Sequence, residues 1–539
     1  MLPPPPPDFR GVFRVDDEAR AVYSESAGIM RVVPLAVAVP QDASAVQCLC
    51  TWATAHGVPL IARGSGSSMS GAAVGAGVVV DTHRLRDMGS VDASYGRLRV
   101  GAAVTRAQAN TAAQEVGLRV PVDPSSGAFA TVGGMAATNA AGPRTMKFGA
   151  MRQWVRALDC VFTDGSRAVV SRGRTGGDSG TLRRWQAAAG TLQERSRTVV
   201  PPGVRKNASG YGIHEFGGTG DLVDLLVGSE GTLALFVAVE LDLAPLPVAT
   251  ASLLSSWTTL DGAVRGADLA RESGAVACEL LDASFLRVAA RGRTLPVPSD
   301  SECVLLVELE DREPGFAESR AQALATAWGR AGAATVLLGL DPESQEALWS
   351  LRHAASPILS RMDPHIRSMQ VVEDGCVPPH RLADYVRGVR QALADSQLDG
   401  VLFGHAGDGH LHVNALVDVR THEWRDRVRS LFDRVVNLTA ELGGTMAGEH
   451  GDGRLRSHVL SRFWSPQALA LFADVKAVFD PAGLLNPGVK MGPFGDPFAR
   501  IKYDPADSLN NPRAERVLAQ VEGERAYDRL RLELLDMTG

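Results

Sequence analysis

The chain has 539 residues, too many for a single hydrophobic core, so we expect at least two domains. Its hydrophobic share of 45%, charged share of 22% and formal net charge of −6 are typical of a globular protein. Basic residues are spread along the chain without a basic–aromatic stripe, which argues against nucleic-acid binding. No apolar run reaches the roughly 18 residues of a transmembrane helix, and no signal peptide is recognisable. We therefore expect a cytoplasmic protein, with peripheral contact to a membrane left open.

The first 30 residues begin with MLPPPPPDF, and this proline run predicts an extended N-terminal arm. Residues 31–245 alternate short strands, helices and glycine-rich turns. They begin with a strand in LAVAVP, a helix in DASAVQCLCTWATAHG that Gly57 closes, and a strand in PLIARG. The six cysteines show no spacing typical of disulfides, zinc or iron–sulfur clusters, so we expect free thiols in a reducing compartment.

Longer amphipathic helices alternate with strands in residues 246–440, which predicts an α+β domain of sheet strands connected by helices. Residues 441–495 form a separate C-terminal segment. Residues 496–539 are a tail that contains NPRAERVLAQVEGERAYDRLRLELLDMTG, a predicted amphipathic helix. This helix either docks on the body of the protein or binds a partner.

Four glycine-rich segments indicate one elongated ligand. ARGSGSSMSG (62–71) follows a predicted strand, and such a loop can turn several N–H groups toward an anion. A Rossmann fingerprint would need a glycine where Met69 stands and a helix afterwards, so a nicotinamide dinucleotide site is not expected. The other three segments are PVDPSSGAFATVGGMAATNAAGPRTMKFG, RKNASGYGI and LLVGSEGTLALF. A single ligand lying across all four explains them better than four unrelated turns.

Three histidines and an aspartate are crowded among glycines in GHAGDGHLH, residues 404–412. The strand LHVNALVDV alternates, so His412 and Asn414 share one face. Were the segment helical, His405 and His412 would be ~10 Å apart along the axis. One metal ion needs both imidazoles within ~2.1 Å, so a glycine turn must fold His405 back.

GTMAGEHGDG, residues 444–453, offers Glu449 and His450 side by side between glycines. Two imidazoles and one carboxylate are a plausible open site for Zn²⁺ or a similar divalent ion. The alternative, polar loop residues without a metal, is equally compatible with the residue types alone.

Seven ordered segments resemble FAD-linked oxidases of the vanillyl-alcohol oxidase type. They are PLIARGSGSSMSG, DPSSGAFATVGGMAATNAAGPRTMKFG, KNASGYG, LLVGSEGTL, GHAGDGHLH, GEHGDG and FDPAGLLNPG, and they extend over roughly residues 30–492. The branch is similar to the glycolate oxidase FAD subunit, D-lactate dehydrogenase and D-2-hydroxyglutarate dehydrogenase.

The resemblance implies an α+β fold. A two-subdomain, PCMH-type FAD-binding domain would occupy residues 31–245. A substrate or cap domain, with an antiparallel sheet covered by helices, would occupy residues 246–440. Residues 441–495 would complete the active site and the FAD domain.

The same resemblance implies the FAD-binding residues. The pyrophosphate would lie on the first loop, and the flavin and ribityl chain on the second segment. The expected set is Arg63, Gly64, Ser65, Gly66, Ser67, Ser68, Pro124, Ser125, Ser126, Thr131, Gly133, Gly134, Ala137, Thr138, Asn139, Gly142, Glu230, Gly231 and Asn486. Some relatives attach flavin through a histidine or cysteine of the first loop; this loop has neither, so we expect non-covalent FAD.

By resemblance, His405, His412 and Glu449 match the metal ligands, with zinc favoured and manganese or iron open. His450 matches the general base, and a neutral histidine suits that role near pH 7. His410 is the rival base, although relatives often have asparagine there.

Arg352, in the predicted helix ALWSLRHAASPIL, matches the arginine that binds the substrate carboxylate; a surface arginine is the alternative. Asn414 could add a hydrogen bond. We therefore expect a metal-assisted, FAD-dependent dehydrogenase that oxidises a D-2-hydroxy acid to the 2-oxo acid. QVVEDGCVP has no lysine before its acidic residues, unlike the D-2-hydroxyglutarate branch, which favours a D-lactate-like substrate over D-2-hydroxyglutarate or glycolate. Arg361 or Arg367 could substitute for that lysine.

GEHGDGRLRS is similar to long relatives in which a cysteine-rich iron–sulfur half follows. This chain stops before such a half, so we expect electrons to pass to a separate iron–sulfur subunit, a quinone or a cytochrome. Two alternatives remain: an ether-lipid (alkyl-dihydroxyacetone-phosphate) synthase-like flavoenzyme, and a non-catalytic FAD-binding subunit of a larger complex. A homodimer is also left open.

Overall fold

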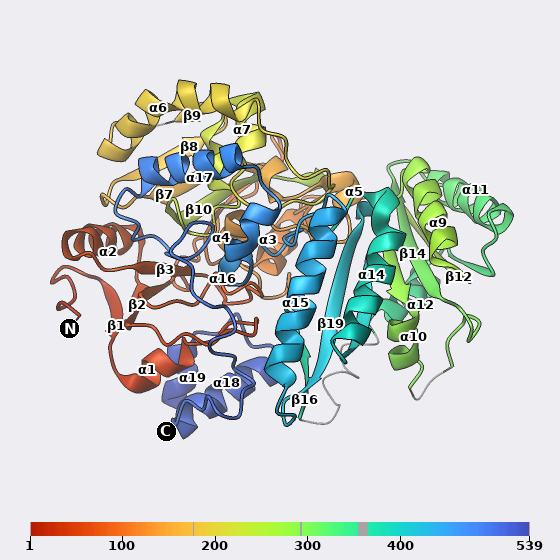
Figure 1. Ribbon diagram of the computed structural model, residues 1–539. Helices are drawn as coiled ribbons and strands as arrows, with labels where there is room; N and C mark the ends of the chain where they lie inside the picture. Colours follow the sequence, from red (N-terminus) through yellow and green to blue (C-terminus); the bar gives the residue numbers. More distant parts are fainter. Residues whose placement is uncertain (1, 176, 292–293, 354–364, 538–539) are drawn as a thin grey trace.

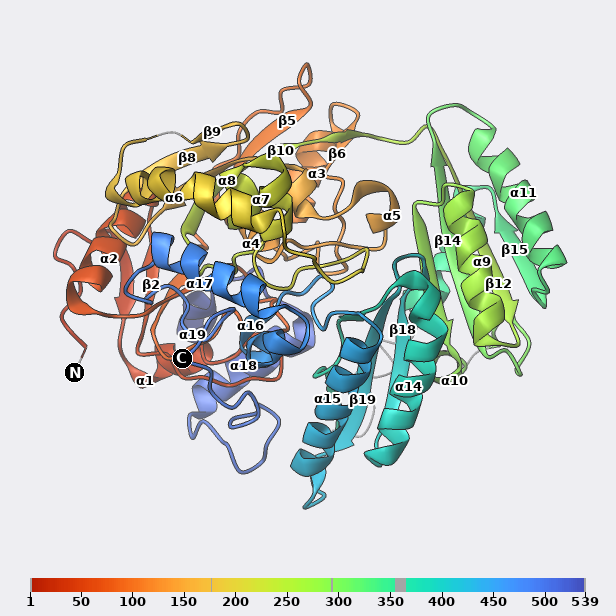
Figure 2. The same cartoon turned by 45° about the horizontal axis from the view of Figure 1, so that its top comes forward.

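A computed structural model describes residues 2–175, 177–291, 294–353 and 365–537. The chain forms an N-terminal half with two sheets and a second half built on one large sheet, here called the cap sheet (Figure 1). The two halves lie side by side, and the last hundred residues return to the N-terminal half (Figure 2). This α+β arrangement confirms the predicted fold class.

A four-stranded sheet opens the N-terminal half, in the order β1-β2-β4-β3. Strands β2, β4 and β3 are parallel, and β1 pairs with β2 in the antiparallel sense. Helix α2 begins after the N-cap Asp42 and ends at Gly57, whose φ of 64° is left-handed, so the predicted strand–helix–strand unit is confirmed. The bounds are β1 Gly11–Arg14, α1 Asp17–Val22, β2 Ala36–Pro40, α2 Ala43–His56, β3 Leu60–Arg63 and β4 Val78–Asp81. Residues 1–30 thus contribute an edge strand and a short helix beyond their proline run.

A five-stranded antiparallel sheet completes the N-terminal half, in the order β5-β10-β7-β8-β9. Its strands are β5 Arg97–Gly101, β7 Val155–Val161, β8 Arg167–Ser171, β9 Arg174–Thr175 and β10 Leu235–Asp242. The helices are α3 Arg106–Gln114, α4 Val132–Thr138, α5 Thr145–Phe148, α6 Gly180–Ser196, α7 Ile213–Thr219 and α8 Leu222–Leu226. A short pair, β6 Leu118–Arg119 and β11 Ala244–Pro245, leads into the second half.

The cap sheet has eight antiparallel strands in the order β15-β12-β14-β13-β18-β19-β16, and β17 also pairs with β19. Its strands are β12 Ala249–Trp257, β13 Ala277–Asp282, β14 Cys303–Asp311, β15 Thr335–Gly339, β16 Ile366–Met369, β17 Gly375–Cys376, β18 Asp399–His405 and β19 His410–Asp418. Its helices are α9 Leu260–Glu272, α10 Ala283–Ala289, α11 Phe316–Arg330, α12 Pro342–His353, α14 Leu382–Asp395 and α15 Trp424–Glu441. Helices α9, α11, α14 and α15 pack on one face through a large apolar core (Figures 1 and 2).

Strand alternation separates the core of the cap sheet from its polar face. In β19, Leu411, Val413, Ala415 and Val417 belong to the core under the four helices, as the alternation predicted. His410, His412 and Asn414 therefore point to the opposite face. Part of that face is covered by α10 and α12, which contribute to a smaller apolar cluster.

The C-terminal segment packs back on the N-terminal half. Side chains of α17 (Pro466–Phe479) join the core under α6, and α16 (Gly453–Arg456) precedes it. The tail forms two helices, α18 Pro512–Glu524 and α19 Arg531–Met537, where one was expected, because Arg525 adopts a left-handed φ of 54° that ends α18. Both dock on α1 through a shared apolar cluster. Within the described part of the chain, no helix is long and apolar enough to cross a membrane.

Candidate active site

The hairpin of β18 and β19 brings the three histidines of GHAGDGHLH together. Its turn, Ala406–Asp408 followed by Gly409 at φ 70°, places His405 directly opposite His410, with His412 two residues further along β19. All three imidazoles lie on the polar face of the cap sheet, with ring centroids 4.6–5.3 Å apart. The expected glycine turn thus folds His405 back toward His412.

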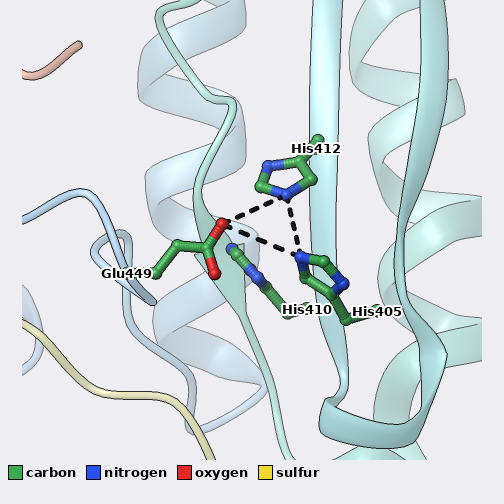
Figure 3. Close-up of side chains that lie close together, drawn as sticks. All are labelled: His405, His410, His412 and Glu449. Carbon is green, nitrogen blue, oxygen red and sulfur yellow. Dashed lines mark hydrogen bonds and ion pairs between the residues drawn. The ribbon is translucent and has the colours of Figure 1, made fainter. Parts of the chain in front are cut away.

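Glu449 joins the imidazoles from the loop that follows α15, and Figure 3 shows its carboxylate facing them. His405 Nε2 and His412 Nε2 are 3.3 Å apart, and Glu449 Oε1 lies 3.7 Å from the first and 3.5 Å from the second. An ion with ligand bonds of about 2.0–2.1 Å at tetrahedral angles separates its ligand atoms by about 3.3 Å. The three side chains, here called the His/Glu cluster, therefore have the spacing of a divalent-metal site.

Hydrogen bonds on the far side of each ring orient the two imidazoles. His412 Nδ1–H donates to the Glu373 carbonyl oxygen at 2.7 Å, and His405 Nδ1–H donates to the Glu279 carboxylate. Each Nε2 then presents a lone pair toward Glu449. Three acceptors that face one another need a cation between them, either a proton or a metal ion. A histidine that binds a metal typically donates its other ring N–H to a carbonyl or carboxylate oxygen, as both imidazoles do here.

The pKa shifts of the cluster agree with a cation held between His405, His412 and Glu449. Burial opposes a charged His405, but the Glu279 carboxylate outweighs it and raises the pKa of His405. Burial, together with the neighbouring imidazoles, lowers the pKa of His412 well below its usual value. Despite burial, His405 and Arg352 lower the pKa of Glu279 to about 2, so its carboxylate stays charged at neutral pH.

Glu449 is held by a buried lysine that the sequence did not single out. Lys206 Nζ donates to Glu449 Oε2 at 3.0 Å and to the Gly142 carbonyl at 3.0 Å. Burial disfavours a charged Glu449, but Lys206 and the histidines lower its pKa well below the usual range. The carboxylate therefore stays available as an anionic ligand.

His450 faces the cluster from the other side of Glu449. Its Nε2 lies 3.4 Å from Glu449 Oε1, and its Nδ1 lies 3.2 Å from Glu373 Oε1. Burial opposes protonation of His450, but Asp374, Glu373 and Glu449 together raise its pKa well above the usual value. Glu373 thus binds Nδ1 and leaves Nε2 as the nitrogen that can exchange a proton with a ligand.

Asp374 fixes the backbone of this loop. Its carboxylate accepts the N–H groups of Glu449, at 3.1 Å, and His450, at 2.9 Å, and it also accepts from His410 Nε2 at 3.0 Å. Arg456 lies against the same carboxylate, with Nη1 3.3 Å from Oδ2. His410, the rival base, is therefore fully buried and committed to Asp374.

The two expected substrate-binding side chains lie beside the cluster. Arg352 Nε donates to Glu279 Oε2 at 2.8 Å, and its guanidinium lies over the Phe403 ring at 4.4 Å. Asn414 is on the same sheet face as His412, and its Oδ1 accepts from Gln370 Nε2 at 3.4 Å. Arg367 is exposed and lies over the Tyr503 ring, whereas Arg361 lies outside the described residues.

A cavity of about 1160 Å³, part of it open to solvent, occupies the N-terminal half and reaches Glu449 and His450. All but three of the expected FAD-binding residues line it. The lining members are Arg63, Gly64, Ser65, Gly66, Ser67, Ser68, Pro124, Ser125, Ser126, Thr131, Gly133, Gly134, Ala137, Thr138, Glu230 and Gly231.

Glycines in the cavity wall allow its segments to pack closely, because a side chain there would clash with neighbouring residues. A Cβ on Gly64 would come within 2.4 Å of Thr131 Oγ1, and one on Gly133 within 2.7 Å of the Ala102 Cβ. The first loop lines the cavity, and its backbone N–H groups and serine hydroxyls are of the kind that bind a pyrophosphate. The residues present fit FAD.

The three expected residues outside the lining have structural contacts. Asn139 caps α4 at φ 51° and accepts from the Arg152 N–H at 2.9 Å. Gly142 accepts from Lys206. Asn486 donates to the Glu230 and Ala72 carbonyls, so it supports the cavity wall from behind.

The cavity and the Glu449 loop share hydrogen bonds. Glu230, which lines the cavity, accepts the N–H groups of Asp452 at 2.8 Å and Gly453 at 2.9 Å. Ser70 Oγ donates to the His450 carbonyl at 3.1 Å. The first glycine loop and the LLVGSEGTL turn therefore hold the Glu449 loop in register with the cavity.

Four supporting residues escaped the sequence analysis: Lys206, Glu279, Glu373 and Asp374. One signal was available for Glu279, since a glutamate inside the apolar run ACELLD has to be paired when that strand is buried. The others sit in quoted segments, RKNASGYGI and QVVEDGCVP, whose partners are distant in sequence.

Known protein families match both halves of the chain. The family described as "FAD binding domain" matches residues 34–171, and "FAD linked oxidases, C-terminal domain" matches residues 246–489. Glycolate oxidase subunit GlcD of Bacillus subtilis is 28% identical over 481 residues, which cover 88% of this chain and 93% of the relative. D-lactate dehydrogenase of Archaeoglobus fulgidus is 29% identical, with coverages of 90% and 96%. D-2-hydroxyglutarate dehydrogenase of Escherichia coli is 27% identical; the match covers 90% of this chain but 51% of that relative, so the chain spans about half its length.

Solved structures share the fold. 4-Ethylphenol oxidase from Gulosibacter chungangensis has a TM-score of 0.66 at 15% identity, covering 90% of this chain and 94% of that one. Alkyldihydroxyacetonephosphate synthase has a TM-score of 0.59 at 14% identity, with coverages of 89% and 82%. The two matched families account for both halves of the chain. This protein therefore carries the FAD-binding domain and the C-terminal domain of the FAD-linked oxidases and is a flavoprotein oxidoreductase.

Proposed function

We propose that the protein is an FAD-dependent D-2-hydroxy acid dehydrogenase that uses a divalent cation. One observation carries the proposal: the cavity lined by the expected FAD-binding residues reaches His450 and Glu449, and Glu449 belongs to the His/Glu cluster. An alcohol held at the cluster would then lie next to both a redox cofactor and a base. The moderate identity to glycolate, D-lactate and D-2-hydroxyglutarate enzymes supports the same substrate class.

His405, His412 and Glu449 would hold the cation, and zinc suits two imidazoles and a carboxylate, with manganese and iron as alternatives. When bound, the cation would lower the pKa of the substrate hydroxyl, and FAD would accept the hydride from C2 at its N5.

His450 Nε2 takes the hydroxyl proton as the C2–H bond breaks, which leaves the 2-oxo acid. Glu373 binds Nδ1 and so fixes the tautomer that exposes Nε2. Because carboxylates raise the pKa of His450, the reaction should speed up with rising pH as Nε2 loses its proton.

Arg352 is the proposed partner of the substrate carboxylate. Its Nε bond to Glu279 fixes the guanidinium next to His405, and a guanidinium can bind a carboxylate through two parallel hydrogen bonds. Asn414 is proposed to donate a further hydrogen bond from the same sheet face.

The substrate is proposed to carry a small side chain without a second carboxylate. Arg367, one candidate cation for a distal carboxylate, is exposed and stacked on Tyr503. We therefore favour D-lactate over D-2-hydroxyglutarate. The electrons would leave to a separate iron–sulfur protein, a quinone or a cytochrome, in keeping with the relative named as a glycolate oxidase subunit.

Anaerobic reduction of the purified flavoprotein tests the proposal. D-Lactate should bleach the flavin absorbance, and a panel of D-hydroxy acids with longer or acidic side chains should do so more slowly. His450→Ala should keep its FAD and lose bleaching by about 10²–10⁴-fold, the usual contribution of a general base. Flavin that stays oxidised with every acid of the panel would refute the dehydrogenase, and such inertness is what an ether-lipid synthase or a non-catalytic subunit would show.

A further inference from the structure

We propose that Lys206 is a positioning residue that restricts Glu449 to a single oxygen at the His/Glu cluster. The inference rests on the cation assigned under the proposed function, and it concerns a buried side chain that does not line the cavity. Lys206 lies in RKNASGYGI, in the N-terminal half, whereas Glu449 follows the cap sheet.

The contacts of Lys206 join three distant segments. Its Nζ lies 3.0 Å from Glu449 Oε2, 3.0 Å from the Gly142 carbonyl and 3.8 Å from Asp408 Oδ2. The side chain is 0% exposed. An ammonium buried this completely is costly unless it is paired, so its position is fixed by these partners.

The two oxygens of Glu449 have different neighbours as a result. Oε2 accepts from Lys206, whereas Oε1 faces His405 Nε2, His412 Nε2 and His450 Nε2 at 3.4–3.7 Å. A carboxylate can bind a divalent cation through one oxygen or through both. With Oε2 occupied by the ammonium, only Oε1 is presented, and one coordination position stays open for a substrate oxygen.

Lys206 therefore has two effects of opposite sign. Its positive charge repels a cation at the cluster, which weakens binding of the metal. Its hydrogen bond keeps Glu449 from closing over the open position, which favours turnover. Loss of Lys206 should therefore both tighten metal binding and slow the reaction. Loss of a side chain that only supports packing would instead weaken metal binding and slow the reaction.

Cobalt(II) binding to the metal-depleted flavoprotein tests this without any substrate. In Lys206→Met, Co²⁺ should bind about tenfold more tightly than in the wild type, because a neighbouring positive charge is gone. The visible absorption bands of the bound cobalt should weaken and shift, because Oε2 becomes a further ligand and the geometry moves away from tetrahedral. The rate of flavin reduction at saturating Co²⁺ should fall.

Arg205→Gln is the matched control. Arg205 is the adjacent cation; its Nε lies 3.3 Å from Asp408 Oδ1, its side chain is 43% exposed, and it does not contact Glu449. Its cobalt spectrum should equal that of the wild type. If Lys206→Met does not fold, Lys206→Gln, which removes the charge but keeps a donor, should still show tighter binding.

Unchanged cobalt bands in Lys206→Met would overturn the inference, as would weaker Co²⁺ binding in both Lys206 variants or no binding by the wild type. Suppose that the wild type binds Co²⁺ and the Lys206 variants give the expected spectra, but no D-hydroxy acid reduces the flavin. The proposed function then fails, while the role of Lys206 stands.

Discussion

The FAD cavity and the His/Glu cluster adjoin each other, yet they are built in opposite ways. The cavity is lined mainly by glycine, alanine, serine and threonine, and its shape comes from places where no side chain fits. The cluster consists of two buried imidazoles and one carboxylate. The Glu279 carboxylate holds His405, the Glu373 carbonyl holds His412, and Lys206 holds Glu449. Binding in the cavity is thus spread over many backbone groups, whereas binding at the cluster depends on a few side chains.

This difference predicts how each region fails. Removing one side chain from the cavity should cost little, but adding a side chain should block it. At the cluster, removing one side chain should abolish the site and also leave its partners buried and unpaired. Variants that separate FAD retention from metal retention therefore test whether the two regions are as independent as their construction implies.

The largest effect is expected for His405→Ala. Loss of one of three ligands should remove the metal, and with it the several kcal/mol that a cation contributes to a developing alkoxide, roughly 100-fold or more in the rate of flavin reduction. FAD content should stay unchanged, because His405 does not line the cavity. Elemental analysis and the flavin spectrum measure the two separately; wild-type metal content would remove His405 from the ligand set.

Gly133→Val should weaken FAD binding and leave the metal in place, the reverse of His405→Ala. Its Cβ would meet the Ala102 Cβ at 2.7 Å and the Ala102 carbonyl at 2.8 Å, so α4 must shift against the cavity. Overpacking of this kind costs about 1–3 kcal/mol, which corresponds to a roughly five- to 150-fold rise in the dissociation constant of FAD. Metal content should be retained.

Gly190→Ala is the control for the effect of a helical glycine as such. Gly190 lies in α6, and a Cβ there would meet no atom within 4 Å. FAD titration with flavin fluorescence should give the wild-type dissociation constant for this variant. If Gly133→Val retains FAD equally well, the cavity does not bind the cofactor in the way described.

The same contrast explains what could be predicted from the sequence. Glycine-rich turns and alternating strands are local signals, so the glycine-rich segments of the cavity and the polar face of β19 were predictable. The individual lining residues were implied by the family resemblance. The hairpin that joins His405 to His412 followed from the length of the segment and its glycines. The sequence predicted one helix in the tail instead of two. The helix end at Arg525 was missed because arginine rarely adopts the left-handed conformation there.

The supporting charges could not be predicted, because their partners come together only through the tertiary fold. Lys206 and Glu449 are 243 residues apart, and Glu279 and His405 are 126 apart. Nothing local distinguishes such residues from surface charges. A single sequence therefore indicates the ligands of a site more readily than the residues that orient them.

His410→Asn should have the smallest effect and separates orientation from ligation. His410 Nε2 donates to Asp374, which holds the N–H groups of Glu449 and His450, while His410 Nδ1 is buried without a hydrogen-bond partner. Asparagine can supply the same donor to Asp374 without a buried nitrogen left unpaired, so metal content should be retained and thermal stability should be equal or slightly higher. His410→Leu removes the donor and should lower stability by about 1–3 kcal/mol. If His410→Asn instead loses the metal, His410 is a fourth metal ligand beside His405, His412 and Glu449, and not only a support for Asp374.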